Sequence, residues 1–223
     1  MDRFISLWNR WSGSPPPSAA LDANWDSLSR RYSEPHRAYH NLDHIHDCLA
    51  RFDEYAAYAV RPEAASHPAL DGQAWDDVEM AIWYHDVVYD PRHPDNEHQS
   101  CVLFREHAAG LAAQERIDRV AATIMATQAH VSSSTAEALM LDIDLSILGQ
   151  PEDRFAEYDD AIRKEYGHVS ESDYRAGRSK VLRSFLARPR IFVLGYFQDR
   201  YEQTARSNLQ AALDCLDTAT ESS

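Results

Sequence analysis

Histidines and aspartates interrupt otherwise apolar stretches of this chain, and they are the residues best suited to chemistry. In residues 81–90, AIWYHDVVYD, apolar and aromatic side chains surround the adjacent His85 and Asp86. A helix drawn through this stretch is apolar on every side, which is typical of a buried helix. A second stretch carries Asp142 and Asp144 among aliphatic side chains. Burying such groups costs free energy unless they are hydrogen-bonded, paired or bound to a metal.

A third pair of candidates is His40 and His44, which are four residues apart and would share one face of a helix. Imidazole together with carboxylate suits Mn, Fe, Ni, Zn or Mg rather than a metal selected by thiolates. Each pair alone has a common structural explanation, either a solvated helix face or a capping or hydrogen-bonded carboxylate. Three such interruptions in one chain favour a shared metal site, because one ion would satisfy them all.

The elements that must position these residues are predicted to be helices. Apolar residues recur at helical spacing, and proline, glycine and serine mark the breaks between them. The predicted helices cover residues 1–11, 18–32, 41–60, 75–89, 96–109, 112–128, 135–148, 151–166, 172–187 and 189–216. No convincing run alternates as a strand does, and the chain has only 7 glycines. We therefore expect an all-α protein with an N-terminal segment and proline-rich break (1–17), one helical domain (18–216) and a disordered tail (217–223).

Composition limits the partners and the compartment. The 223 residues carry a net charge of -14, from 36 acidic and 22 basic side chains. This charge argues against a nucleic-acid backbone or an anionic membrane as partner, but not against a small phosphate ester, because a metal can supply local positive charge. The three cysteines, Cys48, Cys101 and Cys215, form no disulfide or zinc-knuckle pattern. With no membrane-length apolar run and no signal-peptide core, the sequence predicts a cytoplasmic protein.

The candidate ligands together resemble a known signature. His44, the His85–Asp86 pair and Asp144 are similar to the H…HD…D pattern of the HD-domain superfamily of metal-dependent phosphohydrolases. The likeness covers about residues 20–215 and is greatest to the bacterial group described as predicted metal-dependent HD superfamily phosphohydrolases. It implies an HD-type helical bundle in which these four residues bind one divalent ion per chain, with Asp86 able to bridge to a second ion.

The same likeness implies a reaction and further roles. The segment 39–44, YHNLDH, resembles the Y-H-N-x-x-H segment of cyclic nucleotide phosphodiesterases, in which the first histidine protonates the leaving oxygen. His40 would do this here, and Glu97 would orient it or carry the proton onward. The expected reaction is attack of a metal-bound hydroxide on a small phosphate ester, with a nucleotide as the favoured class. Residues expected to contact the substrate are Asn41, Tyr89, Lys164 and Arg178.

Two alternatives stay open. One is a di-iron oxygenase of the HD type, and the other is a metal-retaining module that binds or senses a nucleotide. Tyr89 stands where phosphodiesterases carry a further histidine, so a second metal is an open question, and His130 is a candidate ligand for it or for phosphate. All four expected ligands are present, which favours the hydrolase over the sensor. The sequence predicts neither the native metal nor the oligomeric state.

Overall fold

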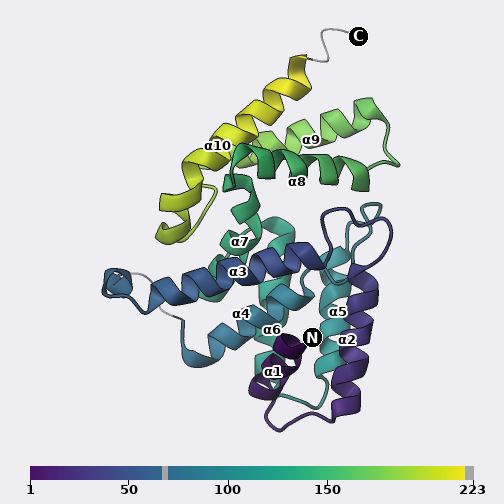
Figure 1. Ribbon diagram of the computed structural model, residues 1–223, viewed down its shortest axis with the longest axis vertical. Coiled ribbons are helices and arrows are strands. Elements are labelled where there is room, and N and C mark those ends of the chain that lie inside the picture. The colour runs from purple at the N-terminus through teal and green to yellow at the C-terminus, as the bar shows by residue number, and fades with distance from the viewer. Residues whose placement is uncertain (67–69, 219–223) are drawn as a thin grey trace. The chain divides into compact units, whose positions relative to one another are not determined.

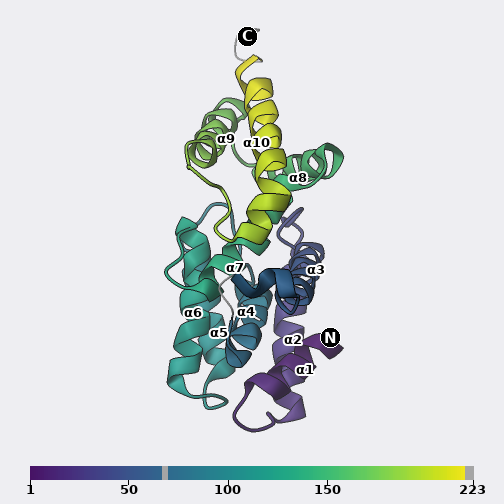
Figure 2. The same cartoon turned by 90° about the vertical axis from the view of Figure 1, so that its left-hand side faces the viewer.

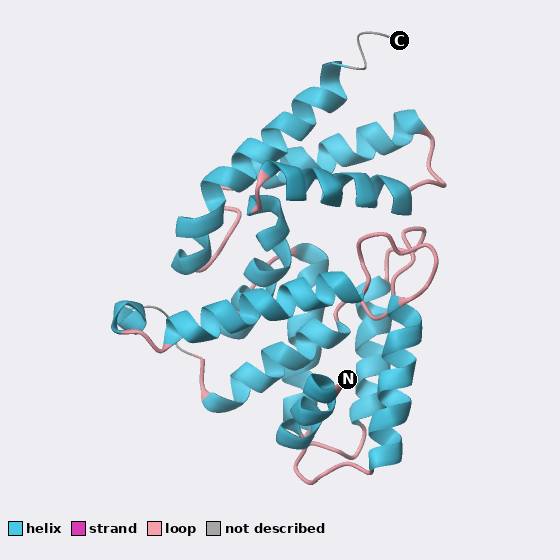
Figure 3. Cartoon of the chain, viewed as in Figure 1, coloured by secondary structure: helices cyan, strands magenta, loops and turns pink. Residues whose placement is uncertain are grey.

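The computed structural model describes residues 1–66 and 70–218, and in these ranges it contains ten α-helices, two short 3-10 helices and no strand (Figure 3). The predicted all-α fold is therefore confirmed. The chain divides into two compact units, Met1–Ile143 and Asp144–Ser223. The domain boundaries predicted at residues 17 and 216 stay predictions, and His67, expected to be a surface or structural histidine, lies outside the described residues.

The first unit is built around α4. Its elements are α1 (Asp2–Trp11), α2 (Ser18–Tyr32), α3 (Leu42–Ala59), η1 (Pro62–Ser66), α4 (Gly72–Tyr84), α5 (Asn96–Ala108), α6 (Gln114–Ala129) and α7 (Thr135–Asp144), whose last residue begins the second unit. Helix α4 packs against α1, α3, α5 and α6 (Figures 1 and 2). Every residue from Asp77 to Tyr84 is buried. The apolar run before His85 therefore forms a buried helix, as its composition predicts.

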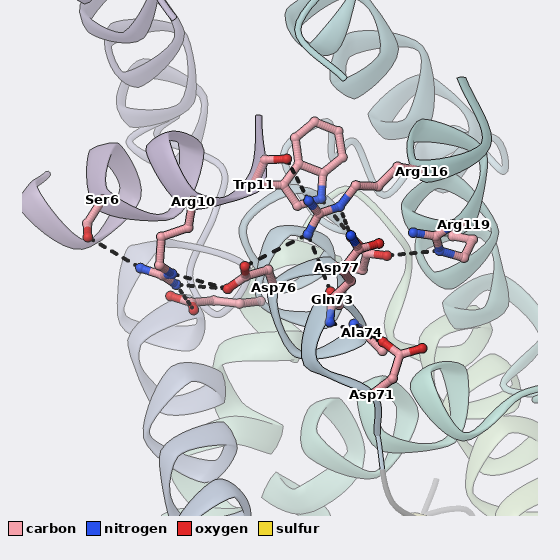
Figure 4. Close-up of polar contacts among 11 residues, drawn as sticks. Ser6, Arg10, Trp11, Asp71, Gln73, Ala74, Asp76, Asp77, Arg116 and Arg119 are labelled. Carbon is pink, nitrogen blue, oxygen red and sulfur yellow. Dashed lines mark hydrogen bonds and ion pairs between the residues drawn. The ribbon is translucent and has the colours of Figure 1, made fainter. Parts of the chain in front are cut away.

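A buried carboxylate fastens α1 to this core. Asp77 of α4 is only 2% exposed and accepts hydrogen bonds from Trp11 Nε1 at 2.8 Å, Arg116 Nε at 2.7 Å and Arg119 Nε at 3.0 Å (Figure 4). Arg116 also donates to the Trp11 carbonyl oxygen at 2.7 Å. We call Trp11, Asp77, Arg116 and Arg119 the Asp77 cluster. It joins α1, α4 and α6, and the carboxylate charge is matched by two guanidinium groups.

The second unit contains η2 (Leu145–Gly149), α8 (Glu152–Glu165), α9 (Glu171–Leu186) and α10 (Gly195–Thr218). Helix α10 packs against η2 and α9, and α8 packs against η2. The side chain of Asn208 donates to the carbonyl oxygens of Leu148 and Gln150, both at 2.9 Å. A Cβ built on Gly149 would lie 2.5 Å from Cβ of Tyr201. Glycine is therefore required where η2 meets α10, since any side chain would clash.

Three predicted helix limits are wrong. Helix α4 ends at Tyr84 instead of Tyr89, and the turn that follows carries His85 and Asp86. Helix α7 ends at Asp144 and continues as the 3-10 helix η2. Helix α10 begins at Gly195 instead of residue 189, because the side chain of Glu202 accepts hydrogen bonds from backbone amides that precede it.

No helix in the described ranges has the length and apolar character needed to cross a membrane.

Candidate metal centre

The turn after α4 holds the first two candidate ligands. His85 is the C-cap of α4, and its Nδ1 lies 2.9 Å from the carbonyl oxygen of Ile82, one turn earlier. That contact favours the tautomer with the proton on Nδ1, which leaves Nε2 as the ligand atom. Asp86 follows directly, and its Oδ2 lies 3.0 Å from His85 Nε2. The end of the helix thus presents an imidazole and a carboxylate side by side.

The third ligand comes from the first turn of α3. Asn41 caps this helix by accepting hydrogen bonds from the amides of Asp43 at 2.8 Å and His44 at 3.4 Å. The cap fixes where the helix begins and hence where His44 points. His44 Nε2 lies 3.2 Å from His85 Nε2 and 3.4 Å from Asp86 Oδ2.

These three ligand atoms fit one metal ion. Atoms bound at about 2.0–2.2 Å to a common ion lie roughly 2.9–3.5 Å apart in tetrahedral or octahedral geometry. The observed separations among the three atoms, 3.0, 3.2 and 3.4 Å, fall in that range. His44 and His85 are 2% and 1% exposed, while the Asp86 side chain is 17% exposed and so leaves the cluster open to solvent on one side. We call His44, His85 and Asp86 the metal cluster.

The charge state of Asp86 suits a metal ligand. Burial raises the pKa of its carboxyl, but the neighbouring imidazoles of His85, His40 and His44 outweigh that effect and hold the pKa well below its usual value. Asp86 is therefore ionised at neutral pH, as a carboxylate ligand must be.

A thiol that the sequence analysis did not place in the site lies against it. Cys48 is buried one turn after His44, and its Sγ lies 3.7 Å from His44 Nε2 and 3.8 Å from His44 Nδ1. The spacing of four residues from a predicted ligand was the signal that could have identified it. It adds a sulfur atom to the nitrogen and oxygen atoms that could hold a metal ion.

His40 is not on the same helix as His44, so the predicted shared helix face is wrong. Helix α3 begins at Leu42, and His40 belongs to the turn before the Asn41 cap. The two imidazole centroids are nevertheless 6.0 Å apart. The His40 ring stacks on Tyr89, with centroids 4.0 Å apart and an interplanar angle of 25°. The structure thus brings His40, Tyr89 and the metal cluster together.

The turn between α4 and α5 is held by side chains of α5. Ser100 accepts a hydrogen bond from the amide of Val88 at 3.1 Å and donates to its carbonyl oxygen at 3.3 Å. The side chain of Asn96 accepts from the amide of Asp90 and donates to its carbonyl oxygen, both at 3.0 Å. Glu97, a predicted catalytic residue, lies between them in the first turn of α5 and is half-buried.

A buried arginine that the sequence analysis also missed holds the other side of this turn. Arg37 donates hydrogen bonds to the carbonyl oxygens of Asp86 at 2.6 Å and Val87 at 3.0 Å. The only signal in the sequence was the position of Arg37, two residues before the segment 39–44 that resembles phosphodiesterases.

The other predicted site residues from this part of the chain lie on α6 and α7. Asp144 is the last residue of α7 and opens the second unit, so its role as a fourth ligand stays a prediction. Asp142 is fully buried in the first unit. His130, the C-cap of α6, adopts a left-handed conformation with φ 51°.

Two predicted substrate contacts lie in the second unit. Lys164 is exposed in the last turn of α8. Arg178 is buried, and its Nε and Nη2 donate to Asp159 Oδ1 at 2.9 and 2.6 Å, while its guanidinium lies 5.3 Å from the centre of the Tyr158 ring. This ion pair gives Arg178 a structural role within its own unit. Whether either residue contacts the substrate stays a prediction.

Comparison of the chain with protein-family models, with curated proteins and with solved structures found no match. An all-α protein with a buried cluster of histidine and aspartate that could hold a metal ion is what the fold and the geometry establish.

Proposed function

We propose that the protein is a metal-dependent phosphohydrolase of the HD type, which cleaves a small phosphate ester. The observation that carries the proposal is the convergence of His44, His85 and Asp86, with His40 beside them. The H…HD…D likeness of the sequence supports it, and it adds Asp144 as the fourth ligand. A nucleotide is the favoured substrate class.

The metal cluster would activate a water molecule as the nucleophile. His44, His85 and Asp86 would hold a divalent ion, whose chemistry is to lower the pKa of a bound water toward neutrality and to stabilise charge on phosphoryl oxygens. Two imidazoles and a carboxylate suit Mn, Fe, Ni or Zn better than an ion that prefers oxygen ligands alone. The Asp86 side chain is 17% exposed, so solvent can reach one edge of the cluster.

His40 is suited to protonate the leaving oxygen. Its ring stacks on Tyr89, and its centroid lies 6.0 Å from that of the candidate ligand His44. His40 is only half-buried, so a substrate can contact it. A histidine placed in this way can donate a proton to the leaving alkoxide. The net charge of -14 favours a small ester over a long polyanion, because the rest of the surface would repel the latter.

The test separates ligation from proton transfer. Phosphate release is measured for wild type, His44→Ala and His40→Ala across nucleotides and simple esters, with Mn, Mg, Ni, Co, Zn and Fe added in turn. His44→Ala should lose both bound metal and activity. His40→Ala should keep its metal and lose about 10²–10⁴-fold in rate, with a smaller loss for esters that have an acidic leaving group such as nitrophenolate.

The same series distinguishes the alternatives. If His40→Ala strips the metal, or loses equally on good and poor leaving groups, then His40 is not the general acid. Consumption of dioxygen by the iron-loaded protein would favour the oxygenase, and nucleotide binding without turnover would favour the sensor. Asp144→Ala with wild-type metal content would remove Asp144 from the ligand set and make Asp142 the next residue to test.

A further inference from the structure

Arg37 links the two segments that form the candidate site. Its side chain has no exposed surface. Nη1 donates to the carbonyl oxygens of His40 at 2.9 Å and Asp86 at 2.6 Å, and Nη2 donates to that of Val87 at 3.0 Å. Nε donates to Glu34 Oε2 at 3.0 Å. One guanidinium therefore bridges the backbone before α3 and the backbone after α4.

Different hydrogen bonds orient His85 and Asp86. The His85 ring is oriented by the carbonyl oxygen of Ile82 in its own helix. Asp86 lies beyond the end of α4. The Val87 amide still donates to the Tyr84 carbonyl oxygen at 3.2 Å, but the carbonyl oxygens at a helix end have no helical donor. The hydrogen bonds from Arg37 to the Asp86 and Val87 carbonyl oxygens hold the peptide planes that follow, and so limit where the Asp86 carboxylate can point.

Aromatic rings keep the guanidinium in place. Its central carbon lies 5.2 Å from the centre of the Tyr32 ring and 5.6 Å from that of Tyr89. Tyr89 in turn stacks on His40. The backbone and the ring of His40 are thus both tied to Arg37, one directly and the other through a single aromatic side chain.

We propose that Arg37 is a positioning residue that sets the Asp86 carboxylate for metal binding and holds His40 beside it. Its polar contacts are to three backbone carbonyl oxygens and one carboxylate, so it acts on the site through the backbone of other residues. A lysine would keep the charge but lack the rigid fork of donors that serves several carbonyl oxygens at once. The part concerning His40 rests on the proposed function, whereas the part concerning Asp86 needs only metal binding.

The experiment compares Arg37→Lys with Arg116→Lys. Arg116 is a matched control in the same unit, because it too binds a carboxylate, a backbone carbonyl oxygen and an aromatic ring, in its case Asp77 and Trp11 (Figure 4). Cobalt(II) is titrated into each metal-free protein, and its visible absorption reports both affinity and ligand geometry. Thermal unfolding of the metal-free proteins reports stability.

Both variants should lose stability, but only Arg37→Lys should change the metal site. Loss of a group that orients a ligand typically costs 10–100-fold in metal affinity, so we expect cobalt(II) to bind at least about tenfold more weakly to Arg37→Lys, with an altered absorption band. Arg116→Lys should bind cobalt(II) as wild type does. Equal affinity and equal spectra for the two variants would overturn the proposal.

A milder variant covers the case in which Arg37→Lys does not fold. Glu34→Gln weakens the bond that holds Arg37 Nε, and it should reduce cobalt(II) affinity roughly two- to fivefold, as expected for one half-exposed ion pair. If Arg37→Lys unfolds and Glu34→Gln binds cobalt(II) like wild type, the proposal is wrong. A wild type that hydrolyses no ester would refute the proposed function alone, because the cobalt(II) comparison would still decide the role of Arg37.

Discussion

Replacing Asp77 by asparagine should destabilise the first unit by about 3–4 kcal/mol, since breaking one partner of a buried ion pair costs roughly 3–5 kcal/mol. The side chains of Asp77 and Arg116 are 3% and 13% exposed, so their hydrogen bond lies in the range of about 1.5–3 kcal/mol for bonds to charged groups. Arg119 is 51% exposed and can turn to water, so it adds at most about 1 kcal/mol. In Asp77→Asn, Arg116 keeps its hydrogen bond to the Trp11 carbonyl oxygen. The expected loss of unfolding free energy therefore lies near the lower end of the range of about 3–5 kcal/mol.

Urea unfolding followed by tryptophan fluorescence measures this loss of unfolding free energy with probes that lie in the first unit. All five tryptophans, at positions 8, 11, 25, 75 and 83, belong to the first unit. The fluorescence change therefore comes from side chains of that unit. The same loss should lower its melting temperature by about 6–16 °C, at roughly 2–4 °C for each kcal/mol.

A double-mutant cycle decides whether the ion pair is the cause. Arg116→Met alone should also destabilise, because it leaves Asp77 with less compensation. Asp77→Leu is the second single variant of the cycle. The double variant, Asp77→Leu with Arg116→Met, should cost much less than the sum of these two single changes, since apolar groups then replace both charges. A loss below about 1 kcal/mol for Asp77→Asn, or a coupling energy below about 0.5 kcal/mol, would refute the reasoning.

Two further predictions concern packing and pH. Gly149→Ala should destabilise the second unit by about 1–3 kcal/mol or more, because its Cβ would lie 2.8 Å from the Tyr201 backbone. Gly177 has open space around it inside α9, so Gly177→Ala should stabilise the protein by about 0.5–1 kcal/mol. Thermal unfolding followed by circular dichroism measures both changes, and equal melting temperatures for the two variants would contradict this prediction. Burial lowers the pKa of His107, which contacts the Tyr84 hydroxyl, below its unfolded value of 6.5, so the unfolding free energy should decrease as the pH falls through about 6.5. His107→Gln should flatten that decrease in urea titrations at several pH values, and an unchanged slope would exclude His107 as its source.

The sequence predicted the existence of the helices better than their ends. The apolar run before His85 could only be a buried helix, and Asn41 is a recognisable cap with its amide partners two and three residues on. The end of α4 at Tyr84 could not be read in the same way, because no glycine or proline occurs between Gly72 and Pro91. Ser100 and Asn96 of the next helix hold the turn that follows, and such contacts are tertiary.

The candidate site shows the same limit. Residue type and spacing offered His40 with His44, and His85 with Asp86, as candidate ligands. The resemblance to the H…HD…D pattern chose His44 over His40, and the structure brings His44, His85 and Asp86 together. Cys48 was missed because a lone cysteine does not indicate a metal site by itself, and its spacing of four residues from His44 was not considered. The partner of Arg178 is Asp159, nineteen residues earlier and on another helix, so only the structure could show that this arginine already forms an ion pair.

The two buried polar clusters of the first unit differ in a way that bears on function. In the Asp77 cluster, the carboxylate meets only hydrogen-bond donors, two guanidiniums and an indole, as a purely structural carboxylate should. In the metal cluster, two imidazole nitrogens and a carboxylate oxygen face one another at 3.0–3.4 Å. The nearby arginine donates to backbone carbonyl oxygens instead of to that carboxylate. The chain thus neutralises one buried aspartate with its own cations, whereas it directs the other at two potential metal ligands, and this contrast is what a cation-binding site requires.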